Sequence, residues 1–372
     1  MSELLEQADN ILNNIIVFPK WREKYEKEAF SLYKRVAEQG NAYAQYRLGC
    51  MYLGSDVTKA LGLIEKSAEQ GNVDAQFSLG EIYFNGRDVK QDFTKALKWY
   101  KKAAIQEDAS SQYRLGYMYY NGYGVEQDLS KAFEWYEKAA KQEHLGARYM
   151  LGAMYRYGYG VEQDLSKAFG CYEKLENQID SHYKWKARYE MGEMYYYGEG
   201  VEQNHTKAFK LFEESAHYRD RIHGNNAALY MLGHMYHFGE GVDKNYTKAF
   251  EFYNKSAEYS NERAKIAISF IHSLVDYSKR SFSDSFGQAE ESFDQEYAKT
   301  IELCTKAAEN GNPEAQWYLG SMFYLCGGKL YCKEIVEWNT KSAENGYGLA
   351  QYRLGCIYFY GGMGMKANVV KA

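Results

Sequence analysis

Two histidines three residues apart are the first candidates for chemistry in this sequence. His234 and His237 lie in the segment LGHMYHFG, and side chains at positions i and i+3 of one helix lie on the same side, where they can reach a common metal ion. A zinc site needs a third and a fourth ligand, and neither an HExxH motif nor an acidic partner at ligand spacing accompanies this pair. We therefore expect no metal and no other cofactor, and we expect both histidines to be exposed.

The cysteines do not form a recognisable catalytic or redox site. No two of them make a CxxC pair, and they are scattered along the chain, which indicates free thiols in a reducing compartment. Glu and Lys residues recur at the i+3 and i+4 spacing of a solvated helix surface, so they do not indicate an acid–base pair. The sequence predicts that the protein is not an enzyme. The six cysteines are Cys50, Cys171, Cys304, Cys326, Cys332 and Cys356.

A glycine-rich segment that occurs four times is the last candidate for a chemical site. The twelve residues GYGVEQDLSKAF stand at 122–133 and again at 158–169, and near copies follow at 198–209 and 239–250. A nucleotide-binding loop would carry GxGxxG or a following Lys-Ser/Thr pair after a strand, and these features are missing. Gly-x-Gly instead suits a helix C-cap and a tight turn, after which an Asp or Asn such as Asp128 can cap a second helix. The segment is predicted to join two helices.

This joint belongs to a longer repeat anchored by a Leu-Gly or Met-Gly pair. The glycines of Leu115-Gly116 and Leu151-Gly152 are 36 residues apart, which is the underlying period. A small residue lies four residues before the Leu of the anchor pair, and an aromatic residue lies four residues after it. This i, i+4, i+8 spacing forms one stripe of a helix, here called helix A. The joint and a second helix, helix B, complete each unit. The anchor glycines are Gly49, Gly80, Gly116, Gly152, Gly192, Gly233, Gly320 and Gly355.

The repeated letters resemble those of a known repeat family. Residues 111–140, SQYRLGYMYYNGYGVEQDLSKAFEWYEKAA, are similar to the Sel1-like repeat, a relative of the tetratricopeptide repeat, and the resemblance covers about residues 24–372. It implies an all-α fold, a right-handed superhelical α/α solenoid, with a usual role as a protein-binding scaffold or adaptor. Some secreted members carry a regular disulfide in each repeat, and this sequence lacks that cysteine pattern.

The ends of the array depart from the repeat. We expect residues 1–40 to form an N-terminal helical cap, because a solenoid must cover its first apolar face. Residues 41–372 are expected to form about eight helix pairs plus a terminal half-repeat. The polar, Ser-rich segment 278–297 is expected to be a flexible insertion. The chain stops at Lys371-Ala372, where a helix B should begin, which favours a fragment of a longer protein.

The best candidate for a binding surface is the set of positions that vary between repeats. The first and fourth positions after the anchor glycine change from copy to copy, and in solenoids of this kind helix A lines the concave face. Tyr and Arg are frequent anchors of interfaces because they bury a large area. The alternative is that these tyrosines only shield the joint between repeats. The candidate partner-binding residues are Tyr117, Tyr120, Arg156, Glu193, Tyr196, His234 and His237.

Composition limits the possible partners. The net charge is −5 and both signs are mixed along the chain, so nothing indicates a nucleic-acid or membrane partner. The N-terminal residues lack the positive charge of a signal peptide, and no apolar run reaches transmembrane length, so we expect a cytoplasmic protein.

The predicted function is a non-catalytic scaffold or adaptor that binds a peptide or protein. One alternative is a regulatory or targeting segment of a larger protein or secreted effector. A second is an enzyme acting on a small molecule or glycan, for which no catalytic pair is evident. RNA binding through Tyr with Arg47, Arg114 and Arg353 is a further alternative that the acidic balance disfavours. The oligomeric state is left open.

Overall fold

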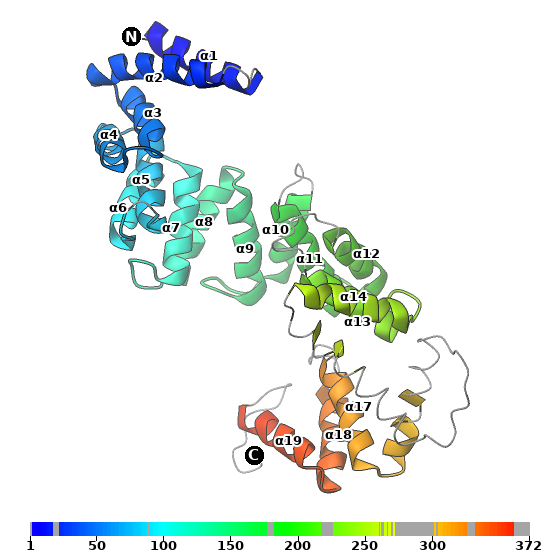
Figure 1. The fold of residues 1–372 in the computed structure, drawn as a ribbon. Coiled ribbons are helices and arrows are strands. Elements are labelled where there is room, and N and C mark those ends of the chain that lie inside the picture. The colour runs from blue at the N-terminus through cyan, green and yellow to red at the C-terminus, as the bar shows by residue number, and fades with distance from the viewer. Residues whose placement is uncertain are drawn as a thin grey trace. The chain divides into compact units, whose positions relative to one another are not determined.

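Every regular element in the described part of the chain is an α-helix (Figure 1). The computed structural model describes residues 2–17, 22–87, 89–176, 182–216, 226–259, 304–325 and 332–360, together with 261, 264–265, 267–268, 271 and 301–302. The helices are α1 (Ser2–Val17), α2 (Arg22–Glu38), α3 (Ala42–Tyr52), α4 (Val57–Glu69), α5 (Val73–Asn85), α6 (Phe93–Ile105), α7 (Ala109–Asn121), α8 (Leu129–Lys141), α9 (Leu145–Tyr157), α10 (Leu165–Glu176), α11 (His182–Tyr197), α12 (His205–Ala216), α13 (Asn226–Phe238), α14 (Tyr246–Glu258), α17 (Pro313–Leu325), α18 (Cys332–Glu344) and α19 (Gly348–Tyr360).

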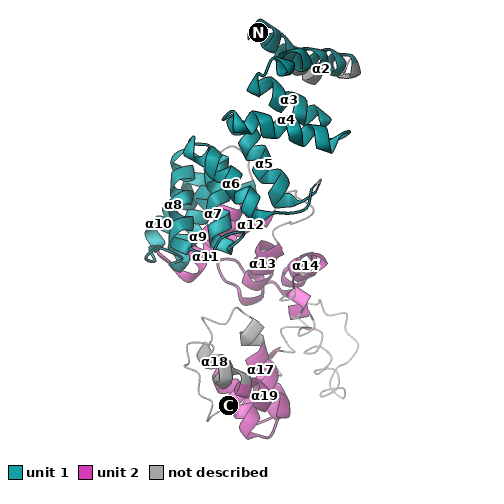
Figure 2. Cartoon of the chain, turned by 90° about the vertical axis from the view of Figure 1, so that its left-hand side faces the viewer, with its two compact units in different colours: residues 1–183 teal, residues 184–372 magenta. Residues whose placement is uncertain are grey.

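The helices pack in consecutive pairs, as the repeat predicts. Helix A of a unit contacts its own helix B, as in α7 with α8, and helix B contacts the next helix A, as in α8 with α9. This order confirms the predicted α/α solenoid. The chain divides into two compact units, residues 1–183 and 184–372 (Figure 2), and both are built from such helix pairs.

The glycine-rich segment has the predicted geometry of a joint. Gly122 and Gly124 have φ angles of 74° and 66°, which place both in the left-handed region that only glycine adopts readily. The side chain of Asp128 then caps α8 by accepting a hydrogen bond from the backbone N–H of Lys131 at 2.9 Å. The backbone N–H of Asp128 donates to the carbonyl of Tyr119 at 3.0 Å, which ties the joint back to α7.

The anchor glycine allows helix A and helix B to approach closely. A Cβ atom added to Gly116 would lie 2.6 Å from the ring of Tyr136 on α8, nearer than real Cβ contacts. Tyr136 and Ala132 are fully buried at this contact, and Leu115 is buried beside the glycine. The short contact explains why this position holds glycine in a helix interior, where glycine is otherwise destabilising.

Successive repeats are joined by glutamine side chains as well as by apolar contacts. Gln76 on α5 donates to the backbone carbonyl of Ala68 on α4 at 2.9 Å, and its own side-chain oxygen accepts from Gln106 at 2.8 Å. Gln112 and Gln142 repeat the side-chain contact one unit later, at 2.9 Å. These bonds satisfy polar groups that the stacking of repeats would otherwise bury without partners.

The first repeats show how the array departs from its rule. The joint between α3 and α4 is short, as the 31-residue spacing from Gly49 to Gly80 predicts, and Asp56 caps α4. At the N-terminus, Asp9 on α1 accepts hydrogen bonds from the hydroxyls of Tyr33 and Tyr43, the latter at 2.9 Å.

One predicted feature, the insertion at 278–297, lies outside the described residues. The last helix A, which carries the anchor Gly355 and forms the expected terminal half-repeat, is α19. Within the described residues, no helix has both the length and the apolar character needed to cross a membrane.

Candidate functional site

The residues predicted to line a binding groove differ in burial. Tyr117, Tyr120 and Glu193 are half-buried. The exposed fractions of Arg156, Tyr196, His234 and His237 are only 4%, 1%, 2% and 5%. The expectation that both histidines are exposed is therefore wrong.

Aromatic neighbours bury His237 in the second unit. Its ring stacks on Phe238 with centroids 4.4 Å apart, and the rings of Tyr246 and Tyr253 meet it edge-on. Burial, and then the nearby His234 and Lys244, lower the pKa of His237 to about 3. The ring is thus a neutral part of the core.

A buried polar cluster joins α11 to α13 and the joint that follows. The hydroxyl of Tyr196 donates to Oε2 of Glu240 at 2.6 Å, and Nδ1 of His234 lies 3.2 Å from the same oxygen. On the other side the ring of His205 stacks on Tyr196 at 4.9 Å. No group of three or more metal-binding side chains is formed by the residues that the structure describes. The cluster is suited to holding neighbouring repeats together.

Glu240 belongs to a position that the sequence reasoning missed, the seventh after the anchor glycine. This position is the middle residue of Gly-x-Gly. Its side chain contacts the residue that stands four positions after the anchor glycine of the preceding repeat. Glu240 contacts Tyr196 in this way. In the first unit, the ring centroids of Tyr123 and Phe84 lie 5.9 Å apart, and those of Tyr159 and Tyr120 lie 6.4 Å apart. In the sequence, this position is marked by the change from GYG to GEG within an otherwise repeated segment.

In the first unit these positions, with Tyr157, form two neighbouring groups of contacting aromatic rings, one of Tyr117 and Tyr123 and one of Tyr120, Tyr157 and Tyr159. We call Tyr117, Tyr120, Tyr123, Tyr157 and Tyr159 the tyrosine strip. The ring centroids of Tyr117 and Tyr123 lie 5.8 Å apart, and those of Tyr159 and Tyr157 lie 5.6 Å apart. Tyr157 and Tyr159 are 51% and 42% exposed, whereas the other three are half-buried. The strip crosses from α7 and its joint to the end of α9, where it becomes most exposed.

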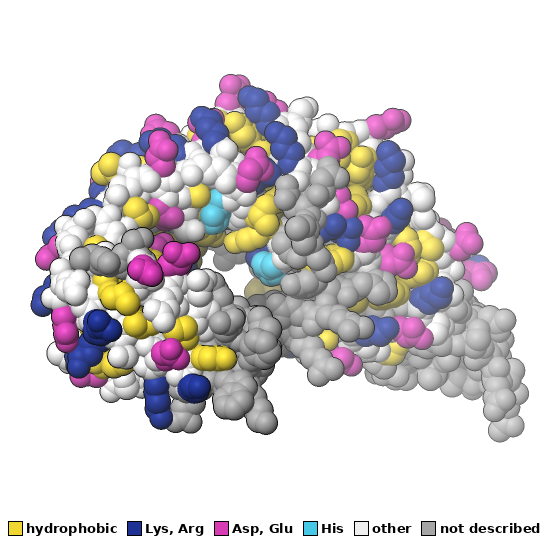
Figure 3. Space-filling model, turned by 90° about the horizontal axis from the view of Figure 1, so that it is seen from above, with side chains coloured by type: hydrophobic (Ala, Val, Ile, Leu, Met, Phe, Trp, Pro, Cys, Tyr) yellow, Lys and Arg dark blue, Asp and Glu magenta, His cyan; other side chains and the backbone are white. Residues whose placement is uncertain are grey.

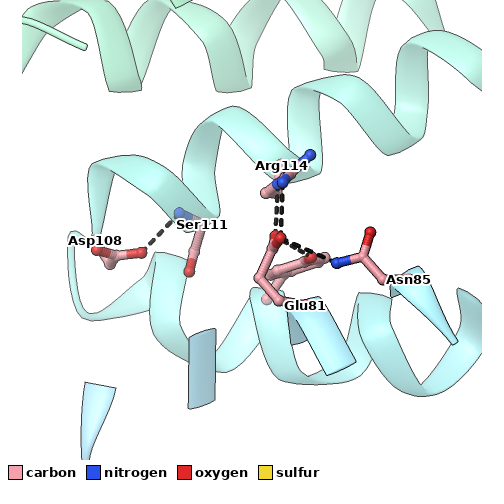
Figure 4. A network of polar contacts seen from close by, with 6 residues as sticks. Glu81, Asn85, Asp108, Ser111 and Arg114 are labelled. Atoms are coloured by element: carbon pink, nitrogen blue, oxygen red, sulfur yellow. Dashed lines mark hydrogen bonds and ion pairs between the residues drawn. The ribbon is translucent and has the colours of Figure 1, made fainter. Parts of the chain in front are cut away.

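A network of polar contacts joins α5 to α7 (Figure 4). Glu81, in the first position after its anchor glycine, accepts hydrogen bonds from Nε and Nη2 of Arg114 at 2.6 and 2.7 Å. The hydroxyl of Tyr100 also donates to Glu81 at 2.6 Å. Arg114 lies over the ring of Phe84 with its Cζ 5.6 Å from the centroid. The Arg114 charge is therefore compensated by Glu81.

The surface charge is mixed. Figure 3 shows Lys and Arg side chains lying among Asp and Glu side chains and separate patches of hydrophobic side chains on one face of the molecule. The joints of α7–α8 and α9–α10 each present one exposed acid, Glu126 and Glu162. Each lies three residues after a tyrosine of the strip, Tyr123 or Tyr159. Acidic and aromatic groups thus recur together at an interval of one repeat.

Three cysteines of the described chain are free thiols of low reactivity. Burial raises the pKa of Cys50 and of Cys171, and it raises the pKa of Cys304 to about 11. The thiolate is the nucleophilic form, so these side chains are poor nucleophiles near neutral pH.

Comparison with a family model and with solved structures gives a consistent result. The model of the Sel1 repeat matches residues 25–41, 42–72, 73–108, 109–144, 146–178, 185–217, 226–258, 293–312, 313–332 and 348–372.

Two crystal structures are similar over most of the chain. One is c5321, a protective antigen present in uropathogenic Escherichia coli strains displaying an SLR fold. It is 32% identical, with a TM-score of 0.59 over 90% of this chain and 68% of that chain. The other is a Sel1 repeat protein from Oxalobacter formigenes, 26% identical, with a TM-score of 0.51 over 88% of this chain and 89% of that chain. No curated protein matches the chain.

Proposed function

Because the chain belongs to the Sel1 repeat family, whose members generally mediate protein–protein interactions, we propose that it is a non-catalytic adaptor that binds a peptide or protein partner. We assign the contact to the tyrosine strip of the first unit. The observation that carries this proposal is the exposure of Tyr157 and Tyr159 at the end of a row of contacting rings.

The strip has the properties of a binding surface. Tyrosine buries a large apolar area while losing few rotamers, and its hydroxyl still offers a hydrogen bond. The half-buried members, Tyr117, Tyr120 and Tyr123, are held by neighbouring rings, so little side-chain freedom remains to be lost on binding. Pre-ordered rings next to exposed ones favour a contact that spans the two adjacent repeats.

The remaining predicted partner-binding residues take a supporting role in this proposal. Arg156 is buried with its guanidinium 5.3 Å from the ring centroid of Tyr157, where it orients that ring. Glu193 accepts a hydrogen bond from Tyr189 at 2.6 Å. Tyr196, His234 and His237 are too buried to touch a partner without rearrangement. The free thiols of the described cysteines suit the cytoplasmic location that we propose with this function.

Affinity capture with matched variants tests the proposal. The unaltered chain and a triple variant, Tyr120→Ser/Tyr157→Ser/Tyr159→Ser, would be used as baits in lysate from the native source. The control is Tyr259→Ser, which removes a tyrosine of similar exposure, 41%, far along the sequence at the end of α14. We expect a protein that the unaltered chain and the control retain and the triple variant loses, with circular dichroism showing equal helix content. Equal capture by all three baits would place the binding surface elsewhere.

A further inference from the structure

We infer that the tyrosine strip binds an extended basic segment, whose Lys or Arg side chains lie against the tyrosine rings and the carboxylates of Glu126 and Glu162. This inference rests on the proposed function and names the chemistry of its partner. It follows from three features of the first unit: exposed acids that form no ion pair with the described residues, rings that accept cations, and the spacing of the repeats.

The two carboxylates are exposed, and the charge of Glu162 contributes only weakly, after Asp164 and Tyr155, to raising the pKa of Lys167. Neither Glu126 nor Glu162 forms an ion pair with a residue that the structure describes. The neighbouring acids of the same joints are already used, because Asp128 pairs with Lys131 at 2.8 Å and Asp164 with Lys167 at 3.2 Å. The acids beside the strip therefore remain available for a partner's charge.

Tyrosine rings of the first unit already accept cations. The ammonium of Lys131 lies 5.8 Å from the ring centroid of Tyr119, and that of Lys167 lies 5.3 Å from Tyr155. Within the strip, the guanidinium of Arg156 lies 5.3 Å from the centroid of Tyr157. A cation over an exposed tyrosine ring contributes about 0.5–1 kcal/mol. A ring with a carboxylate nearby favours Lys or Arg over a neutral side chain.

Repeat geometry sets the spacing of the partner's charges. Helices α7 and α9 contact each other directly, and packed helices lie about 8–10 Å apart. A partner segment in the polyproline II conformation advances about 3.1 Å per residue with three residues per turn, so every third side chain lies on the same side and reaches the equivalent point of the next repeat. The strip therefore fits a segment with basic residues three positions apart and apolar residues between them. An acidic segment would be repelled, and a wholly apolar one would bury the carboxylates without partners.

Selection from a random peptide library displayed on phage tests this inference. The baits are the unaltered full chain, the charge-reversed variant Glu126→Lys/Glu162→Lys, and the tyrosine variant Tyr157→Ser/Tyr159→Ser. The control is Glu134→Lys, which reverses an exposed charge on α8 away from the joints. We expect peptides enriched in Lys or Arg at a spacing of three on the unaltered chain and on the control. Reversal should shift the selection to Asp and Glu, and the tyrosine variant should lose the basic peptides.

The outcomes separate this inference from the proposed function. Neutral or acidic peptides that the tyrosine variant loses would overturn the basic preference while leaving the strip as a binding surface. A basic preference that survives charge reversal would overturn the assignment to Glu126 and Glu162. Peptides that bind the tyrosine variant as well as the unaltered chain, or no enrichment on any bait, would overturn both.

Discussion

The hydroxyl of Tyr196 lies 2.6 Å from Oε2 of Glu240, and the two residues belong to consecutive repeats. Tyr196 stands in the fourth position after one anchor glycine, and Glu240 stands in the seventh position after the next. Glu240 has a side chain that is 13% exposed, and it also faces Nδ1 of His234 at 3.2 Å. The Gly-x-Gly joint of one repeat therefore holds helix A of the repeat before it.

Replacing Glu240 with Ala should destabilise the second unit. The Tyr196 hydroxyl, whose side chain is 1% exposed, would lose its carboxylate acceptor. The loss of an acceptor for a buried hydroxyl costs about 1–3 kcal/mol. The matched control is Glu202→Ala, an exposed acid of another joint. Urea unfolding followed by circular dichroism measures both changes, and equal midpoints for the two variants would contradict the role assigned to Glu240.

Stability should fall as the pH is lowered, and His237 should be one cause. Its pKa is about 3 in the folded chain, against about 6.5 when unfolded. Between these values the unfolded state binds a proton that the folded state does not, so the free energy of unfolding rises with pH from about 3 to 6.5 and is flat above. The contribution amounts to about 2 kcal/mol lost at pH 5 relative to pH 8.

The variant His237→Phe isolates this contribution. Phenylalanine keeps a ring between Phe238 and Tyr253 and cannot be protonated. We expect the difference in melting temperature between pH 8 and pH 5 to be smaller for the variant than for the unaltered chain. His144, whose pKa burial also lowers, supplies a comparison in the first unit. A pH dependence unchanged in His237→Phe would show that His237 does not titrate on unfolding.

The sequence was sufficient to predict the fold because the repeat encodes local geometry many times. The glycines that take positive φ, the Asp128 cap and the contact of Gly116 with helix B all follow from residue types at fixed spacing. Each feature depends on residues within one unit, so the period of 36 makes them visible. The solenoid is the consequence of stacking such units.

The candidate site was predicted less well because it depends on contacts between units. Tyr117 and Tyr120 are half-buried members of the proposed strip, but the helical period places a residue on a face without showing what covers that face. His234 is covered by Tyr196, 38 residues earlier in the chain, and by Glu240 of the following joint. The exposed Tyr159 stands in the same joint position as Glu240, so a comparison of the joints would have found both.

Replacing Gly116 with Ala should be destabilising, although alanine is the better helix former. The new methyl would lie 2.6 Å from the ring of Tyr136, which is fully buried, so side chains of the packed core would have to shift. Overpacking of this kind costs about 1–3 kcal/mol. Gly170→Ala is the matched control, because nothing lies within 4 Å of a Cβ at this position in α10. The control should be stabilised by about 0.5–1 kcal/mol. Thermal unfolding measures both changes, and melting temperatures that shift in the same direction for the two variants would contradict the role assigned to the close contact.

Removing one hydroxyl should affect two equivalent tyrosines differently. Tyr100 and Tyr136 occupy the same position of helix B, and both are fully buried. The hydroxyl of Tyr100 donates to Glu81 at 2.6 Å, and burial together with this bond raises its pKa, so it remains a donor. The hydroxyl of Tyr136 has no hydrogen-bond partner among the described residues. Tyr100→Phe should therefore cost about 1.5–3 kcal/mol, the range for a hydrogen bond to a charged group.

Tyr136→Phe should be neutral or slightly stabilising, because it removes a buried polar atom that forms no bond. The reason for the difference lies in the first position after the anchor glycine, which holds Glu81 in one repeat and Tyr117 in the next. Denaturant unfolding of the two variants and of Tyr100→Phe/Tyr136→Phe measures the effects and their additivity. Comparable losses of stability from both single changes would mean that the Tyr136 hydroxyl finds a partner in solution, and the distinction between the two repeats would then be wrong.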